Sequence, residues 1–166
     1  MIKIKFDLDV KNYHGGPQIR LYDKQKLLYE DRLSKKGAQI IELDLDIVLP
    51  TVLTIEHHGK NMRYDTKLVD GNIVDDKGFL IEKIQIDNFT LKNEIYHFKL
   101  KTEDGETISN SNYIGHNGRF IIDIDSENLA IWYYKMKKKL IQSSEAFDYE
   151  QFKSEIFQND KREVSY

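Results

Sequence analysis

Hydrophobic and polar residues alternate along most of the first 124 positions of the chain. From Ile2 to Val10 every second residue is apolar, and the residues between them are lysine or aspartate. This period of two is typical of a strand with one buried face, because successive side chains of a strand point to opposite sides. Further alternating or β-branched stretches occupy positions 19–22, 25–30, 39–45, 51–57, 79–87, 94–100 and 119–124. The pattern therefore predicts a series of short strands.

Turn-forming residues separate these stretches. Clusters of glycine, asparagine, aspartate or proline lie at positions 14–17, 59–61, 103–106 and 117–118, and Pro50 interrupts the chain between two strands. Short strands with a turn about every ten residues are the signature of an antiparallel sandwich. We predict a mainly β fold, an antiparallel β-sandwich of jelly-roll type.

The period changes after Asp125. Ser126 is suited to cap a helix, and apolar residues then recur at helical spacing. A second, thinner apolar stripe predicts another helix over 147–157. We predict a sandwich domain at 1–124 and a C-terminal helical extension at 125–166. The residues of the first stripe are Leu129, Trp132, Tyr133, Met136 and Leu140.

Composition narrows the function classes. The chain has 166 residues, no cysteine and a net charge of −3. It therefore has no disulfide and no zinc–thiolate site, and its overall field does not favour nucleic acid. No apolar run is long enough for a membrane span, and the start of the chain lacks the apolar core of a signal peptide. We expect no membrane partner, and a cytoplasmic location, or a virion if the chain is phage-encoded.

The stretch from 69 to 87 combines an acidic, glycine-containing turn with an alternating strand. If the strand starts at Phe79, one face carries Phe79, Ile81, Lys83, Gln85 and Asp87, and the other carries the residues between them. An oxygen-rich turn at the end of a stiff strand is a candidate ligand site. It is equally typical of an ordinary connection between two strands.

Oxygen donors gather in and around this turn. Calcium takes 6–8 oxygen ligands, and carboxylates are its usual partners in proteins. The EF-hand pattern fails, because Ile81 stands where that motif needs glutamate. The alternative is a solvated turn whose side chains bond their own backbone. The candidate metal ligands are Asp65, Asp70, Asn72, Asp75 and Asp76.

Residues 51–91 resemble calcium-dependent carbohydrate-binding modules of the xylan-binding, jelly-roll type. The matching features are the strand at 52–55, the turn at 59–61, Asp76, and the strand end at 84–88. The resemblance implies that a loop aspartate and nearby carbonyl groups hold calcium, and that the calcium meets sugar hydroxyls. The pattern also looks like one in small structural proteins of tailed bacteriophages, with 117–120 and 131–133 as a second match.

Together these features predict a non-catalytic binding protein or virion structural protein. The alternative is a stand-alone calcium-dependent carbohydrate-binding protein. Its partners would be a glycan or neighbouring virion subunits, and further copies of the chain are another candidate. Tyr64 and Tyr113 are candidates for stacking on sugar rings, and Asn61 is a further candidate ligand-binding residue.

Two further surfaces carry candidate chemistry. Glu42, Asp44 and Asp46 alternate on one strand face, where two carboxylates could act as a glycosidase pair, although a solvated strand face has the same pattern. Four lysines follow the aromatic residues of the 129–140 helix, and we expect that helix to pack or to dock a partner rather than to bind nucleic acid. The predicted docking residues are Trp132, Tyr133, Met136 and Leu140.

Overall fold

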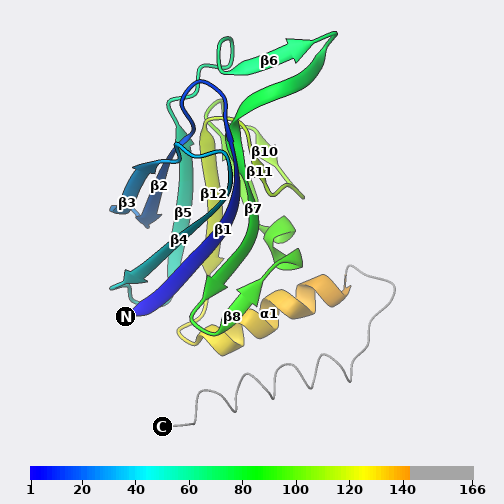
Figure 1. The fold of residues 1–166 in the computed structure, drawn as a ribbon. Helices are drawn as coiled ribbons and strands as arrows, with labels where there is room; N and C mark the ends of the chain where they lie inside the picture. Colours follow the sequence, from blue (N-terminus) through cyan, green and yellow to red (C-terminus); the bar gives the residue numbers. More distant parts are fainter. Residues whose placement is uncertain (143–166) are drawn as a thin grey trace.

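A computed structural model describes residues 1–142, and these form a sandwich of two antiparallel sheets with one C-terminal helix (Figure 1). The predicted mainly β fold is confirmed. The strands are β1 (Ile2–Asn12), β2 (Gln18–Asp23), β3 (Lys26–Arg32), β4 (Gly37–Leu45), β5 (Thr51–His58), β6 (Thr66–Val69), β7 (Asn72–Ile86), β8 (Phe89–Leu91), β9 (Lys99–Thr102), β10 (Thr107–Ile108), β11 (Tyr113–Ile114) and β12 (Gly118–Ile124). The helices are the 3₁₀ helix η1 (Asn93–His97) and α1 (Leu129–Gln142).

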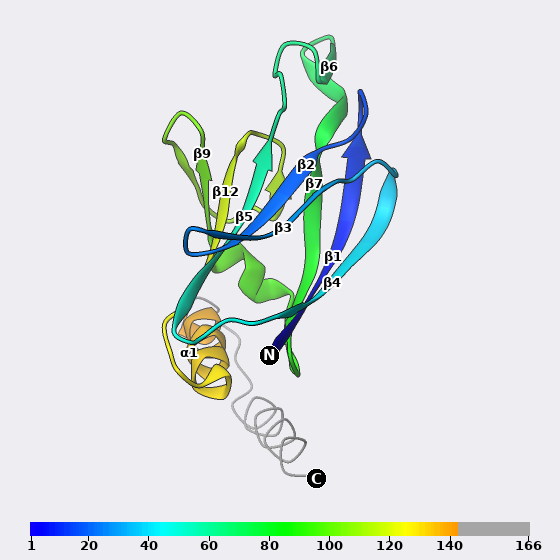
Figure 2. The same ribbon diagram turned by 90° about the vertical axis from the view of Figure 1, so that its left-hand side faces the viewer.

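The two sheets form separate layers, which Figure 2 shows nearly edge-on. The first sheet has the order β11-β7-β1-β4, and β6 and β8 also pair with β7. The second has the order β10-β9-β12-β5-β2-β3. Strands β7 and β5 thus lie inside their sheets, and the longest strand, β7, links the sandwich to a hairpin that projects beyond it (Figure 1).

The core lies between the sheets and comes from the alternation seen in the sequence. The apolar residues of β1 are almost fully buried and face those of β5 and β12. Burying each such side chain contributes roughly 1.5–3 kcal/mol, which favours this register over one shifted by a residue. The buried residues of these three strands are Ile4, Phe6, Leu8, Val10, Leu53, Ile55, Phe120, Ile122 and Ile124.

A β-bulge in β7 changes which face its residues occupy. Asp7 pairs with Lys83 and Leu8 with Ile81, so Glu82 is an extra residue opposite β1. Phe79 and Ile81 are buried as one face, but after the bulge the buried residues are Ile84 and Ile86. The predicted faces were therefore right up to Ile81 and wrong beyond it, since a bulge reverses the alternation.

Residues 94–97 form η1 instead of the predicted strand. Glu94 and Ile95 are adjacent and both buried, whereas a strand with one buried face would direct one of the two side chains outward. The Glu94 carboxylate accepts a hydrogen bond from the Lys92 backbone N–H at 3.0 Å. The strand β9 begins only at Lys99.

Helix α1 begins at Leu129, and its cap is Asn128 rather than the predicted Ser126. The Asn128 Oδ1 atom accepts hydrogen bonds from the backbone N–H groups of Ala130 at 2.8 Å and Ile131 at 3.2 Å. Ser126 instead accepts a bond from the Asn128 N–H at 3.3 Å. Asparagine and serine cap equally well, so the sequence did not distinguish them.

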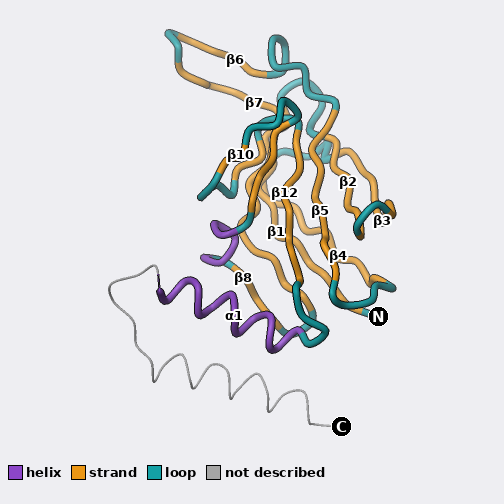
Figure 3. The backbone as a smooth tube through the Cα atoms, turned by 180° about the vertical axis from the view of Figure 1, so that it is seen from behind, coloured by secondary structure: helices purple, strands orange, loops and turns teal. Residues whose placement is uncertain are grey.

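The apolar face of α1 packs on its own sandwich, beside β8 and η1 (Figure 3). Trp132 donates to the Asp123 carbonyl at 2.8 Å, and Tyr133 donates to the Thr90 carbonyl at 3.2 Å. Lys137 pairs with the buried Glu94 at 2.6 Å.

The predicted partner-docking role is thereby corrected for Trp132, Tyr133 and Met136, which are all buried in the chain's own core. The remaining residue of that set, Leu140, is half-buried.

Helix and sandwich share this core, so the change at Asp125 marks a change of secondary structure within one packed body. The second predicted helix, at 147–157, lies outside the described residues. Within residues 1–142, no helix is long and apolar enough to cross a membrane.

Candidate functional site

The predicted acidic turn is the tip of a β-hairpin. Strand β7 begins at Asn72, seven residues before the predicted start at Phe79, and pairs with β6. The turn residues Asp70 and Gly71 have φ of 52° and 78°, a conformation that glycine and aspartate tolerate best. The hairpin extends past the sheets at the end opposite α1 (Figure 1), which leaves Asp70 and Asn72 exposed at its tip.

Asp76, at the base of this hairpin, is buried in a network of donors. Its carboxylate pairs with the Lys60 ammonium group and accepts hydrogen bonds from the Tyr113 hydroxyl and, at 2.8 Å, from the Thr66 hydroxyl. The Lys60 ammonium, whose side chain is only 1% exposed, also donates to the Gly115 carbonyl. Burial alone would raise the pKa of Asp76, but the hydrogen bonds from Lys60, Tyr113 and Thr66 hold it below its ordinary value.

Asp65 is held by a second lysine. Its carboxylate lies 3.0 Å from the Lys77 ammonium and 3.6 Å from His14 Nδ1, and it accepts the Asn61 backbone N–H at 2.8 Å. The Lys77 backbone N–H also donates to the Asp65 carbonyl at 3.0 Å. Burial opposes ionisation of Asp65, yet the bonds from Asn61 and Lys77 lower its pKa. We call Lys60, Asp65, Asp76 and Lys77 the lysine–aspartate cluster.

The residues at this end of the sandwich do not fit a calcium ion. The two buried carboxylates are already neutralised by ammonium groups, and the exposed Asp70 and Asn72 lie at the hairpin tip. Asp75 accepts the backbone N–H of Asp76 at 3.0 Å. Among residues 1–142, no three or more histidine, aspartate or glutamate side chains are grouped so as to hold a metal. The five predicted ligands are thus not gathered into one site.

The predicted sugar-binding residues have different surroundings. Tyr64 is 60% exposed and has the Arg63 guanidinium 5.6 Å from its ring centroid. Asn61 shapes its own turn, accepting backbone N–H groups from Arg63, Tyr64 and Asp65.

Tyr113 serves the scaffold, because its hydroxyl donates to Asp76 and its ring lies against two glycines. A Cβ at Gly78 would come within 2.9 Å of the Tyr113 hydroxyl oxygen, and one at Gly115 within 2.4 Å of the ring. Burial, followed by the bond to Asp76, raises the pKa of Tyr113.

The carboxylates proposed for glycosidase chemistry lie on the outer face of an edge strand or just past it. Glu42 and Asp44 are exposed on β4, and Asp46 follows the end of that strand. Glu42 lies 3.5 Å from the Lys3 ammonium. This is the arrangement of a solvated strand face, which was the alternative interpretation of the pattern.

A pocket of about 390 Å³ opens instead on the outer face of the second sheet. Strand β5 supplies Glu56 and His58, strand β12 supplies Arg119, and the β9–β10 region supplies Lys101 and Glu103. We call it the polar pocket. Its full lining is Glu56, His57, His58, Gly59, Lys101, Thr102, Glu103, Asn117, Gly118 and Arg119.

A row of charged side chains crosses five strands at the polar pocket. Direct pairing places Lys101, Arg119, Glu56, Arg20 and Glu30 side by side on β9, β12, β5, β2 and β3. Glu56 accepts from Arg119 Nε at 3.0 Å and lies 3.7 Å from Arg20 Nη1, and Arg20 Nε donates to Glu30 at 2.7 Å. These contacts hold Arg119, Glu56, Arg20 and Glu30 relative to one another on the outer face of the sheet.

Two further residues shape the rim of the pocket. Asn117 exchanges hydrogen bonds with the Lys60 backbone N–H and C=O, both at 2.9 Å, and donates to Glu103 at 3.2 Å. His58 Nε2 lies 3.5 Å from Glu30 and has no hydrogen-bond partner within residues 1–142. The rim thus carries a fixed amide, whereas the His58 Nε2 atom is buried beside Glu30.

Sequence reasoning missed the residues of this row. The alternation in 19–22, 51–57 and 119–124 places Arg20, Glu56 and Arg119 on outward faces, which is a usable signal. The pairing of those strands was not available from the sequence, because it joins distant residues such as Glu56 and Arg119, and only that pairing puts the side chains next to one another.

Comparison with known proteins supports the fold. No family model matches the chain, and no curated protein sequence is similar to it. A solved structure of vCBM60, from a study of calcium-dependent carbohydrate binding modules, superposes with a TM-score of 0.51 at 10% identity over 74% of this chain and 91% of that one. A second structure, vCBM60 in complex with galactobiose, gives 0.49 at 11% identity, over 73% and 97%.

The chain is thus similar in fold to the carbohydrate-binding module vCBM60. At this level of identity the likeness concerns the fold alone. Both structures are of that one module, so the predicted likeness to bacteriophage structural proteins, and the virion role with it, still rest on sequence motifs only.

Proposed function

We propose that this chain is a non-catalytic carbohydrate-binding protein that holds a glycan in the polar pocket. The observation that carries the proposal is the row of charged side chains fixed across the outer face of the second sheet at the pocket. The fold shared with a carbohydrate-binding module agrees with it.

Sugar hydroxyls both donate and accept hydrogen bonds, and the polar pocket offers both kinds of partner. Arg119 and Lys101 are exposed donors, while Glu103, Glu30 and the Asn117 amide are near the rim. Hydrogen bonds to charged groups contribute roughly 1.5–3 kcal/mol each, and because Glu56 already holds Arg119, little side-chain entropy of that arginine is lost on binding. A pocket of about 390 Å³ is in the range of small-molecule sites and suits a few sugar units.

The carboxylate at the centre of the charged row is engaged by neighbouring donors. Glu56 accepts from Arg119 and from the Tyr22 hydroxyl at 3.1 Å and also faces Arg20. A general acid of a glycosidase sits instead in an apolar surrounding. The contacts of Glu56 therefore favour a binding role.

Binding is expected to be independent of calcium. The lysine–aspartate cluster neutralises its own carboxylates, and none of its four residues lines the polar pocket. We therefore expect the same affinity in excess EDTA as in millimolar calcium.

The test is a glycan array followed by titration calorimetry with the best neutral oligosaccharide, in EDTA. We expect Arg119→Ala to weaken binding by about tenfold, since one charged hydrogen bond of ~1.5 kcal/mol is lost. Arg119 is largely exposed, so its removal leaves the core intact.

Tyr64→Ala at the projecting hairpin end is the matched control and should bind like the wild type. Loss of binding with Tyr64→Ala and not with Arg119→Ala would move the site to the hairpin. Absence of binding to every glycan on the array contradicts the proposed function itself.

A further inference from the structure

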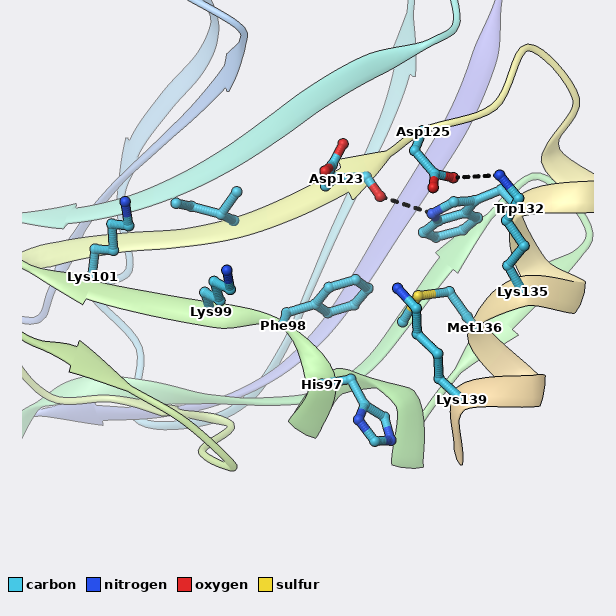
Figure 4. A pocket seen from close by; sticks show the side chains of 11 residues that line it. His97, Phe98, Lys99, Lys101, Asp123, Asp125, Trp132, Lys135, Met136 and Lys139 are labelled. Atoms are coloured by element: carbon cyan, nitrogen blue, oxygen red, sulfur yellow. Dashed lines mark hydrogen bonds and ion pairs between the residues drawn. The ribbon is translucent and has the colours of Figure 1, made fainter. Parts of the chain in front are cut away.

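A second pocket, also of about 390 Å³, lies between the outer face of the second sheet and helix α1. Lysines from two elements line it: Lys99 and Lys101 from β9, and Lys135 and Lys139 from α1 (Figure 4). We call it the lysine pocket. Trp132, Phe98 and Met136 contribute to its floor, so that the pocket joins an apolar floor to a rim of lysines.

The lysine pocket has uncompensated positive charge. Lys135 lies 3.3 Å from Asp125, as the dashed line in Figure 4 shows. Lys99, Lys101 and Lys139 are exposed and take part in none of the ion pairs formed within residues 1–142. Only one further carboxylate, Asp123, lines the pocket. The lysine pocket is therefore positively charged although the net charge of the whole chain is −3.

The lysine pocket and the polar pocket adjoin each other. Lys101 lines both, and strands β9 and β12 run beneath both. The two pockets are therefore neighbours on the outer face of the second sheet, with His58 and Arg119 at one end and Lys139 at the other. An extended polymer suits two neighbouring pockets better than a single small ligand does.

We infer that the lysine pocket binds the carboxylate groups of an acidic polysaccharide whose neighbouring sugar units occupy the polar pocket. This inference rests on the proposed function and names the class of glycan. Lys99, Lys101 and Lys139 bind the carboxylates as point charges on flexible stems, while the polar pocket binds hydroxyl groups. Asp123 repels a carboxylate placed directly against it, so the carboxylates of the polysaccharide bind at the lysines on either side.

Nucleic acid is the other polyanion to consider, and the charges disfavour it. Nucleic acid carries a phosphate on every nucleotide, whereas the two pockets contain the carboxylates of Glu56, Glu103 and Asp123 as well as lysine and arginine. A polymer with a carboxylate on some sugar units and hydroxyls on all of them matches this mixture of charges.

The test compares acidic polysaccharides with neutral ones of the same backbone. The pairs are partly methyl-esterified polygalacturonate and its full methyl ester, and carboxymethylcellulose and hydroxyethylcellulose, each titrated with the full chain. We expect the acidic member of at least one pair to bind about tenfold more tightly, with the difference lost between about 0.05 M and about 0.5 M NaCl, where screening shortens the range of the exposed lysines.

The variant Lys99→Gln/Lys139→Gln changes only the lysine pocket and should remove most of that preference. It should leave the binding of neutral glycans unchanged. The control, Lys26→Gln/Lys138→Gln, removes the same charge from exposed lysines that line neither pocket and should keep the preference.

The outcomes separate the two proposals. If neutral glycans bind as tightly as acidic ones, the inference is wrong and the proposed function stands. No binding to any polysaccharide, neutral or acidic, overturns both. A single-stranded oligonucleotide that binds more tightly than every acidic polysaccharide also overturns the inference.

Discussion

Replacing Lys60 with methionine should lower the free energy of unfolding by about 3–5 kcal/mol, because it leaves the buried carboxylate of Asp76 without its counter-ion. Methionine matches the length and much of the volume of lysine, so the loss reports charge rather than a cavity. The Lys60 ammonium also joins Asp76 to the Gly115 carbonyl, and thus holds the β7 and β11–β12 segments together. Urea denaturation measures the change.

The matched control is Lys67→Met, which removes an exposed lysine from the neighbouring strand β6. Its stability should stay within about 0.5 kcal/mol of the wild type. The double variant Lys60→Met/Asp76→Asn should be less destabilised than Lys60→Met alone, because the uncompensated charge is gone. If Lys60→Met is as stable as Lys67→Met, the ion pair between Lys60 and Asp76 does not hold the β7 and β11–β12 segments together.

The same cluster predicts the response to metal removal. Wild-type unfolding should be unchanged by EDTA or by added calcium, since lysine ammonium groups already neutralise Asp65 and Asp76. A ligand that binds only the folded state stabilises it by mass action. A clear rise in stability with millimolar calcium would therefore reveal a metal site and contradict the interpretation of the cluster.

The protein should lose about 2 kcal/mol of stability between about pH 7 and about pH 5 through His57 alone. Burial lowers the pKa of His57 from 6.5 to about 4. The ring is fully buried, with Nδ1 3.1 Å from the His116 carbonyl and the ring edge against Phe79, and Nε2 has no partner within residues 1–142.

The sign follows from where the proton binds. Between pH 6.5 and 4 the unfolded chain holds a proton on His57 that the folded chain does not, so stability falls as pH falls through this window. Asp65 and Asp76 have lowered pKa values, so their contributions are lost only below it.

Comparing His57→Leu with the exposed His97→Gln isolates the effect. The stability of His57→Leu should depend on pH less than that of the wild type by about 2 kcal/mol over this interval. His97→Gln should keep the wild-type slope, because that side chain is exposed and its solvation changes little on folding. Equal slopes in all three proteins would show that His57 is not buried in its neutral form.

The sequence by itself determined the sandwich. Alternation from Ile2 to Val10 and from Gln39 to Leu45 specifies which residues face the core, because the period of two allows only one face to be buried. The change to a helical period after Asp125 likewise predicted α1, and its apolar stripe packs where such a stripe must, against the core.

Only the tertiary structure decided where binding chemistry lies. The oxygen-rich stretch near Asp76 is typical of a cation site by composition, but the fold brings Lys60 and Lys77 to its carboxylates from other positions in the chain. Conversely, Arg20, Glu56 and Arg119 are unremarkable in sequence and become one row through strand pairing. The local pattern of a strand predicts which of its residues are buried. The charged partner of a residue depends on the register between strands that are distant in the sequence, and no single stretch of sequence contains that information.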